Sequence, residues 1–533
     1  MSDFTGTWTL TRFALRRDRI LLPIWVAIIV LTAVSSAAAT VDLYPDPVSR
    51  AQAASAINNV PSLVAFYGRI WDPQSLGALS TLKLSAIVAA LIGVFAIFLV
   101  VRHTRREEEN GRLELLGATV VGRKAALSAA MIVMFATMLS IGVFTALGMT
   151  AVGLPSAGSW AFGLAWATTG MAYGSIAAVT AQLTMSARSA VGLAIAVLGV
   201  TYVMRAVGDA SGDANGSTWL SWLSPLGWGE QVRAYAGDLW WVLIIPVVFA
   251  GLVVTGAYAL AGRRDLGAGL LPDRAGPAEA PGWLGSPLGL AWRLQRGMLL
   301  GWALGYALLG YFMGSIVSTI GSMVGSPQAQ EFIAKLGGTA VMTDAYLATV
   351  FGFGALISAA YGISVAMRLH AEEEAGHAEL ILSASVSRLR WLASHMFIAL
   401  AGTALLSLIL GLAAATALSL QTGSFDDAGR LVVGALAYLP AVWVFVGLVV
   451  LIFGLVPRLS LLAWVALVAC LVFGEFGTVM ELPDWVIQLS PFSHIPKLPG
   501  GTFTWLPIIV VLVVAALLHA VGALGFRRRD VPA

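Results

Sequence analysis

The sequence predicts an all-α integral membrane protein with twelve transmembrane helices, arranged as two parallel six-helix repeats. Composition is the first observation. Of the 533 residues, 58% are hydrophobic and only 11% are charged, and the mean hydropathy is +0.85. Soluble chains carry about 25% charged residues. A soluble protein of this size could not bury so much apolar surface, so the composition excludes a soluble enzyme, a disordered protein and a fibrous protein.

The membrane spans follow from the length of the apolar runs. A helix that crosses a bilayer needs about 20 mostly apolar residues. No charged residue or histidine occurs from Ala125 to Ala187, and this run is long enough for two spans. We expect the spans near residues 20–40, 81–101, 125–150, 158–181, 188–206, 240–262, 297–320, 346–366, 391–417, 431–455, 459–480 and 504–525.

The basic residues predict the orientation of these spans. If the N-terminus is cytoplasmic, 23 of the 31 Lys and Arg residues fall in cytoplasmic segments, as the positive-inside rule requires. We therefore expect a multi-pass membrane protein with both termini in the cytoplasm. The first span is longer than a typical cleavable signal peptide and is expected to stay as an uncleaved anchor.

An internal repeat is the second observation behind the fold class. Residues 107–123 read EEENGRLELLGATVVGR and residues 372–388 read EEEAGHAELILSASVSR, with identical residues at eight of the 17 positions. Arg263-Arg264-Asp265 recurs 265 residues later as Arg528-Arg529-Asp530. Each repeat holds an even number of spans, so both have the same orientation. The predicted organisation is a first half at 1–265, a cytoplasmic linker at 266–286 and a second half at 287–533.

Sequence motifs for catalysis are missing. The chain has no phosphate-binding loop, no H-E-x-x-H and only one cysteine, and its six histidines are scattered. We therefore expect no catalytic, cofactor or metal site in this chain, and the near-balanced charge suggests no nucleic-acid partner. Arg205 and Glu475 are the main charges within spans, and both are expected near the outer surface. Few mid-membrane charges argue against an ion-driven carrier.

The repeated acidic segment is expected to form a cytoplasmic helix after the second span of each half. Its charges fit i,i+4 pairs at Arg105–Glu109 and Glu108–Arg112. The equivalent pairs in the second copy are Arg368–Glu372 and His370–Glu374, and Leu113, Leu116 and Val120 could form an apolar stripe on the first copy. A solvated charged face would explain one such helix. Two copies at matching places favour a docking surface for a two-fold-symmetric soluble partner.

These motifs resemble a known family. EEENGRLELLGA, EEEAGHAELILSA, SPLGW at 224–228, SPFSHIP at 490–496 and RRDLGAGLLP at 263–272 are similar to the permease subunit of type-two ABC exporters, in the actinobacterial group of polyketide-antibiotic exporters and multidrug efflux permeases. The resemblance implies a protein of the bacterial cell membrane. It also implies a pseudo-dimer of six-span halves like those of the G-subfamily transporters. It also implies alternating-access export of hydrophobic or amphiphilic drugs, which confers antibiotic resistance. ATP and Mg would bind to two copies of a separate ATP-binding subunit.

The resemblance also implies residue roles. The segments that couple to the ATPase would contain Glu107, Glu108, Glu109, Gly111, Arg112, Glu114, Arg123, Glu372, Glu373, Glu374, Gly376, Glu379 and Arg388. Candidate residues for an apolar substrate cavity are Phe95, Phe98, Tyr202, Tyr361, Trp464 and Phe473. Basic segments before spans one and seven would lie on the inner leaflet. The alternatives are an ion-coupled twelve-helix drug carrier, an exporter of lipid or siderophore, and a non-transporting scaffold or sensor. The residues do not identify the compound.

Overall fold

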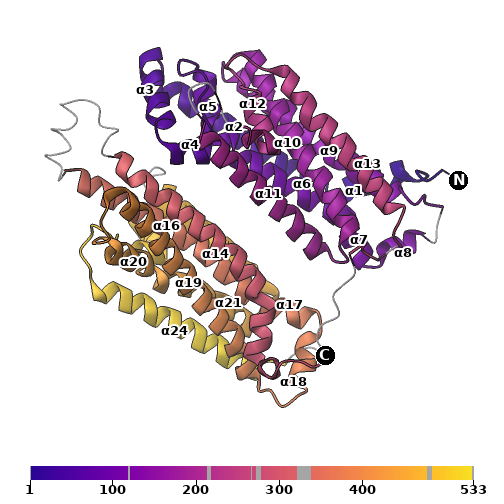
Figure 1. Ribbon diagram of the computed structural model, residues 1–533. Coiled ribbons are helices and arrows are strands. Elements are labelled where there is room, and N and C mark those ends of the chain that lie inside the picture. The colour runs from indigo at the N-terminus through magenta and orange to yellow at the C-terminus, as the bar shows by residue number, and fades with distance from the viewer. Residues whose placement is uncertain are drawn as a thin grey trace. The chain divides into compact units, whose positions relative to one another are not determined.

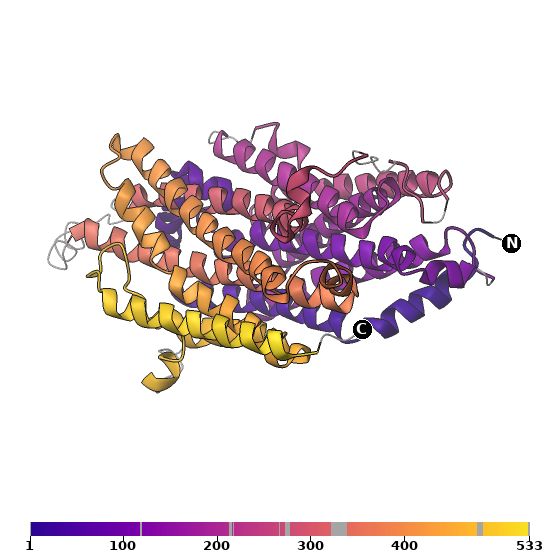
Figure 2. The same ribbon diagram turned by 90° about the horizontal axis from the view of Figure 1, so that it is seen from below.

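The computed structural model describes residues 2–117, 120–212, 216, 218–265, 267–271, 278–320, 338–476 and 483–530. Regular secondary structure in these ranges is helical. Contacts divide the chain into a first unit, Met1–Gly276, and a second unit, Pro277–Ala533. Each unit is a bundle of long helices, shown in Figure 1 and in the turned view of Figure 2.

In the first unit, the short helices lie at the two ends of the bundle. Helices α7 and α8 lie at one end, and α3, α4 and α12 lie at the other (Figure 1). The elements are α1 (Thr7–Arg17), α2 (Leu21–Leu43), α3 (Pro47–Asn58), α4 (Pro61–Tyr67), α5 (Leu76–Ser85), α6 (Ile87–His103), α7 (Arg105–Glu109), α8 (Arg112–Gly117), α9 (Ala125–Ala151), α10 (Ser156–Leu183), α11 (Ala187–Ala210), α12 (Pro225–Gln231) and α13 (Ile244–Ala261).

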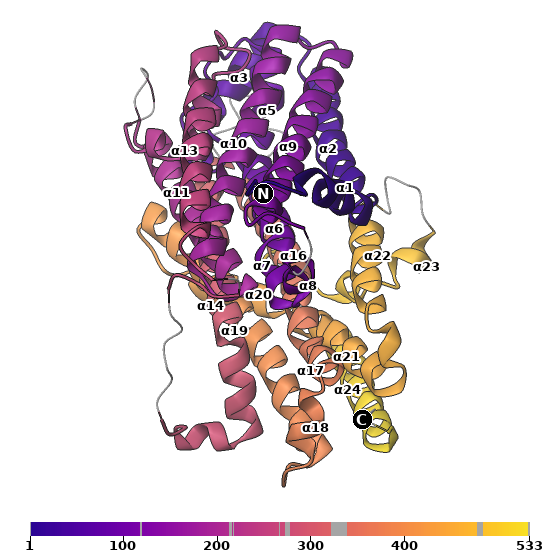
Figure 3. The ribbon, with the colours of Figure 1, turned by 90° about the vertical axis from the view of Figure 1, so that its right-hand side faces the viewer.

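The second unit has a similar order of elements. Helices α17 and α18 lie near the C-terminal end of α24 (Figure 3). The elements are α14 (Pro287–Ile320), α16 (Gly338–Ala366), α17 (Arg368–Glu374), α18 (His377–Leu382), α19 (Arg388–Thr422), α20 (Ala428–Leu436), α21 (Leu439–Leu455), α22 (Leu462–Phe476), α23 (Asp484–Ile487) and α24 (Trp505–Arg528).

Ten helices among the described residues are long and apolar enough to cross a membrane. Two predicted spans fall outside that set. The predicted span 158–181 lies in the long helix α10, and the predicted span 459–480 includes the 15-residue helix α22, while its last residues, 477–480, lie outside the described ranges. The chain is a multi-pass membrane protein, and its twelve-span arrangement stays a prediction.

Helix α10 is less apolar than the ten because it is the central helix of the first unit. It packs against α6, α9, α11 and α13, and most of its residues are buried. Small residues allow this close packing, as at Gly142 of α9, where an added Cβ would lie 2.6 Å from the carbonyl oxygen of Gly163. A helix surrounded by protein does not need the large apolar side chains that face lipid.

The first helices of the two units differ. In the first unit the chain breaks between α1 and α2 at residues 18–20, and α1 lies at an angle to α2 (Figure 3). In the second unit the corresponding basic segment and span form one continuous helix, α14, of 34 residues. The sequence analysis placed that span at 297–320, so the helix begins ten residues earlier than predicted.

Candidate functional site

The repeated acidic segment is two short helices in each unit and not one. Helix α7 ends at Glu109 and α8 begins at Arg112, and Gly111 between them has φ +68°. Gly376 separates α17 from α18 with φ +71°. Space is open around both glycines, so the left-handed backbone, which glycine adopts without strain, explains the repeated glycine. The predicted apolar stripe on a single helix is therefore wrong, and Val120 lies beyond α8 with 61% of its side chain exposed.

Glu108 joins three parts of the first unit. Its carboxylate pairs with Arg105 at 2.7 Å and with Arg264 after α13 at 2.5 Å. Arg105 is fully buried and also donates to the carbonyl oxygen of Ala181 at 2.6 Å, at the C-terminal end of α10. A cation at a helix C-terminus is favoured by the helix dipole. The acidic segment is thus anchored to the ends of α10 and α13.

Two more glutamates of α7 bind other elements of the unit. Glu107 pairs with Arg17 at the end of α1 at 2.6 Å, and with Arg112 at 3.5 Å. Glu109 accepts a hydrogen bond from the backbone N–H of Ala187, at the start of α11, at 2.7 Å. Four helix ends therefore meet at α7.

The predicted i,i+4 pairs of the first copy are wrong. Arg105 pairs with Glu108, and Glu109 binds Ala187. The physical reason is that Arg105 turns inward to the carbonyl of Ala181, while the helix ends before Arg112. The pairs of the second copy are as predicted, with Arg368–Glu372 at 2.6 Å and His370–Glu374 at 3.3 Å.

The second unit repeats two bonds of the first. Glu373 pairs with Arg529 at 2.6 Å, as Glu108 pairs with Arg264. Arg388 donates to the carbonyl oxygen of Arg529 at 2.6 Å. Arg123 donates to the carbonyl oxygen of Arg264 at 2.7 Å in the same way. These bonds, which we call the closing bonds, explain why the repeated residues include an acid in the first triplet and the final arginine.

Other repeated residues of the predicted docking segments lie on the surface. Glu114 on α8 and Glu379 on α18 are exposed, and so are Arg112, Glu374 and His377. Leu380, next to Glu379, has 73% of its side chain exposed. Glu107, Glu108, Glu372 and Glu373 are instead mostly covered by their partners within the chain. The exposed charges thus lie on α8 and α18 and at the adjoining ends of α7 and α17.

An ionic cluster that the sequence did not predict lies at the opposite end of the first unit. Arg205, expected near the outer face of the membrane, is completely buried within the protein, and its position relative to the membrane stays a prediction. Its guanidinium lies 2.9 Å from Glu230, whose side chain is 7% exposed, and 3.6 Å from Asp209, which is buried. Glu230 lies outside the long spans, and burial raises its pKa well above the ordinary value of 4.5, with Arg205 opposing that shift. Glu475, the other predicted span charge, has no described side chain.

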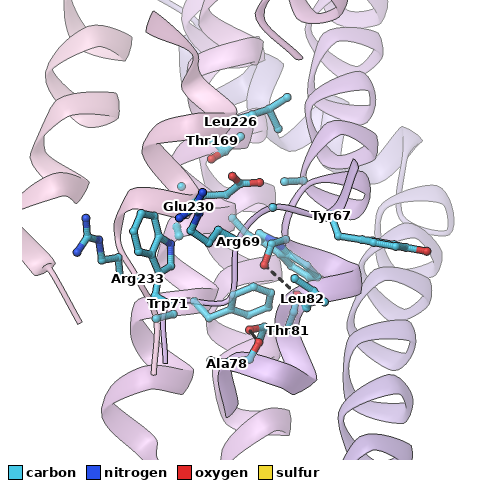
Figure 4. A pocket seen from close by; sticks show the side chains of 18 residues that line it. Tyr67, Arg69, Trp71, Ala78, Thr81, Leu82, Thr169, Leu226, Glu230 and Arg233 are labelled. Atoms are coloured by element: carbon cyan, nitrogen blue, oxygen red, sulfur yellow. Dashed lines mark hydrogen bonds between the residues drawn. The ribbon is translucent and has the colours of Figure 1, made fainter. Parts of the chain in front are cut away.

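Glu230 also lines a small cavity of about 40 Å³. Figure 4 shows Arg69, Trp71 and Thr169 among the residues around it. Arg233 stacks over the ring of Trp71 at 3.9 Å. The cavity has room for water-sized groups and not for a drug-sized ligand, which needs about 300 Å³ or more.

The six predicted cavity residues occupy different environments. Phe95 is buried against Trp25, with ring centroids 5.1 Å apart, whereas Phe98 is 51% exposed. Tyr202 donates to the carbonyl oxygen of Phe66 at 3.1 Å. Tyr361 is fully buried, Trp464 donates to the sulfur of Met367 at 3.2 Å, and Phe473 is partly buried. Their shared role in a substrate cavity stays a prediction.

The fold defines the class of this protein, an integral membrane protein with many helical spans. Its sequence is 44% identical over 535 residues to the multidrug efflux system permease protein Rv1217c of Mycobacterium tuberculosis (strain ATCC 25618 / H37Rv), covering 99% of this chain and 96% of that protein. The family described as "Multidrug efflux system permease Rv1217c, C-terminal domain" matches residues 284–527. The chain belongs to this family of multidrug efflux permeases, which confirms the resemblance found in the sequence.

Proposed function

We propose that this chain is the transmembrane permease of an ATP-driven exporter of hydrophobic or amphiphilic drugs. Two copies of a separate ATP-binding subunit would hydrolyse the ATP, with Mg bound on that partner. Both termini would lie in the cytoplasm, and twelve spans would form two parallel repeats. The efflux-permease relative supports the transport role, and a transport subunit of this kind needs no catalytic residues of its own.

The observation that carries the proposal is the matched pair of helix-glycine-helix elements. In each unit one short helix, α7 or α17, is tied into the bundle, and the other, α8 or α18, presents an exposed glutamate. If the acidic segments served only to form ion pairs within the chain, an exposed second helix would not be needed in either unit. We therefore assign α8 and α18 as the surfaces that dock the ATP-binding subunits.

The ion pairs of α7 supply a route for coupling. A force on α8 would pass through Gly111 to α7, and from α7 through Glu107 to Arg17 of α1 and through Glu108 to Arg264 after α13. Closure of the ATPase would thereby shift the end of the short helix α1 and the segment that follows α13, the last long helix of the unit. Such a change favours an outward-open state only if ATP and substrate contact the two states differently.

The two units would couple unequally. In the first unit Glu108 pairs with two arginines. In the second unit Glu372 pairs with Arg368 and His377, and Glu373 pairs with Arg529. His377 occupies the place of Arg112 and pairs with Glu372 at 2.9 Å. The substrate would pass through an apolar cavity to which Phe95, Tyr202, Tyr361 and Trp464 are assigned as the first candidates for substitution.

The experiment reverses the charge of the exposed acids. Glu114→Lys and Glu379→Lys together should abolish both co-purification of the ATP-binding subunit and drug efflux from cells, while the permease level in the membrane stays unchanged. Asp426→Lys is the matched control, because Asp426 is an exposed acid in the loop between α19 and α20. Normal co-purification and efflux by the double variant would remove the docking assignment.

The second candidate is a proton-coupled drug carrier, and the buried cluster of Arg205, Asp209 and Glu230 favours it. Two carboxylates share one guanidinium away from water, which is an arrangement that can hold a proton. Glu230→Gln separates the two functions. An ATP-driven exporter should keep its efflux with this variant and with a collapsed proton gradient, whereas a proton-coupled carrier should lose efflux in both cases.

A further inference from the structure

A wide apolar groove runs between α2 and α9 in the first unit. Its volume is about 840 Å³, within the range of about 300–1,000 Å³ typical of small-molecule sites. Leu22, Val26 and Val30 line it from α2, and Thr137 and Phe144 line it from α9. We call this feature the α2–α9 groove.

Two residues that line the groove carry a hydroxyl group, and neither hydroxyl is free to bind a ligand. The Thr137 hydroxyl donates to the carbonyl oxygen of Val133 at 2.7 Å, and the Ser140 hydroxyl donates to that of Ala136 at 2.8 Å. Both hydroxyls are thus satisfied by their own helix. An occupant is therefore selected by apolar contact and shape, which suits a hydrocarbon chain.

The groove is long enough to take an acyl chain. Its lining follows α9 from Ala136 to Ala151, a distance of roughly 22 Å at 1.5 Å per residue. The hydrocarbon core of a bilayer is about 30 Å thick, so one leaflet contributes about half of that. The groove is therefore longer than the hydrocarbon depth of one leaflet.

The end of the groove that is lined by α1 carries positive charge. Leu15 of α1 lines this end, and Arg12, one helical turn before it, lies on the same helix face. Arg16 and Arg19 follow, and all three arginines are exposed and form no ion pair with another described residue. Trp8 and Phe13 of α1 are 65% and 58% exposed, as expected for an amphipathic helix at a membrane surface.

We propose that the α2–α9 groove binds an acyl chain of an anionic phospholipid, whose phosphate group contacts Arg12, Arg16 and Arg19. An apolar slot of this length, with exposed arginines at the end lined by α1, complements a lipid with a negative headgroup. This inference goes beyond drug export and requires only that the chain spans a membrane.

The second unit supplies the control. Arg293 and Arg296 of α14 are exposed and correspond in sequence to Arg16 and Arg19. There, however, α14 packs closely on α19, since an added Cβ at Gly310 would lie 2.5 Å from the carbonyl oxygen of Leu410. Arginines without an open groove behind them should attract lipid headgroups but hold no acyl chain.

The experiment measures which lipid reaches the groove in the full chain. In a Cys470→Ser background, Ser140→Cys carries a fluorophore, and the protein is placed in vesicles of phosphatidylglycerol and phosphatidylcholine. Either lipid carries a nitroxide on its acyl chain to quench the fluorophore. A matched label at Leu252→Cys, on a 69% exposed site of α13, reports on bulk lipid.

The expected result is a roughly fivefold or greater preference for phosphatidylglycerol at Ser140→Cys and none at Leu252→Cys. Fivefold corresponds to the ~1 kcal/mol that one basic residue contributes near an anionic surface. Arg12→Gln with Arg16→Gln and Arg19→Gln should abolish the preference, while Arg293→Gln with Arg296→Gln should keep it. Ala27→Trp, which fills the groove and keeps the arginines, should reduce quenching by both lipids.

Two outcomes would overturn the proposal. Equal quenching by both lipids at Ser140→Cys would mean that the groove takes bulk lipid without selection. Quenching by neither lipid would mean that protein covers the groove. Each labelled variant must keep the drug efflux of the unlabelled chain, so that misfolding is not the cause of either outcome.

Discussion

In the two units, equivalent buried side chains near the first long helix bond to different neighbouring helices. Asp18, fully buried between α1 and α2, pairs with Arg102 at 2.8 Å and His103 at 2.7 Å at the end of α6. Gln295 stands at the equivalent place in the second unit and lies 3.0 Å from the Nδ1 of His395 on α19. The side chain at this buried position thus binds α6 in the first unit and α19 in the second.

This difference shows how one side chain can shape a membrane surface. Where Gln295 holds α14 to α19, glycines allow the two helices to pack closely. Where Asp18 holds the chain to α6, the groove between α2 and α9 stays open. Units with repeated closing bonds at one end can therefore present different surfaces to lipid.

The largest expected effect comes from breaking the Asp18 pairs. Asp18→Asn removes the carboxylate that accepts hydrogen bonds from Arg102 and His103, and hydrogen bonds to charged groups contribute about 1.5–3 kcal/mol each. Gln295→Leu removes one hydrogen bond, with a cost of about 1 kcal/mol. Thermal unfolding in detergent should show a clearly lower Tm for Asp18→Asn than for Gln295→Leu. Equal shifts would contradict the assigned difference.

The closing bonds should also differ in strength between the units. Glu108→Gln weakens charged hydrogen bonds to two arginines, whereas Glu373→Gln weakens the bond to Arg529. Hydrogen bonds to charged groups contribute about 1.5–3 kcal/mol each. We expect a larger fall in Tm, and a larger loss of efflux, for Glu108→Gln. The comparison fails if Glu373→Gln has the greater effect.

Helix packing gives a third test. Gly310→Leu would push a side chain against the backbone of α19, and overpacking of this kind costs about 1–3 kcal/mol. Ala27→Leu points into the open α2–α9 groove and should change stability by about 0.5 kcal/mol or less. The Tm values of the two variants measure this difference in stability. A destabilising Ala27→Leu would show that the groove is filled by protein.

The smallest expected effect concerns pH. The raised pKa of Glu230 means that the folded chain keeps a proton that the unfolded chain releases above pH 4.5. Stability should therefore fall as the pH rises from 4.5 through the raised pKa. Glu230→Gln should flatten this part of the Tm-against-pH curve, while an unchanged slope would remove Glu230 as its source. Ser224-Pro225 of the first unit corresponds to Ser490-Pro491 of the second, and at this offset Pro496 stands where the first unit has Glu230. The second unit therefore has no carboxyl group at that place to contribute to the pH dependence.

Hydropathy was enough to place most of the long helices, because a lipid-facing helix must be apolar along its length. It was less informative for α10, whose neighbours are protein and whose residues are accordingly small. It also could not show that α14 is continuous while α1 and α2 are separate, since the two segments have similar basic and apolar patterns.

The candidate site was only partly predictable. The repeated acids and glycines identified the segments, but the sequence could not show that Gly111 and Gly376 break the helices, because a glycine is also tolerated within one. The partners of Glu107 and Glu108, Arg17 and Arg264, lie 90 and 156 residues away in the chain. Pairing over such distances is set by the packing of whole helices and not by local spacing.

The closing bonds have a consequence for how the protein is made. Arg123 binds a carbonyl that lies 141 residues further along the chain, and Arg388 does the same. At a synthesis rate of about 5–20 residues per second, each arginine is without this partner for roughly 7–28 s after it leaves the ribosome. Each unit can therefore be completed only when its last span has emerged.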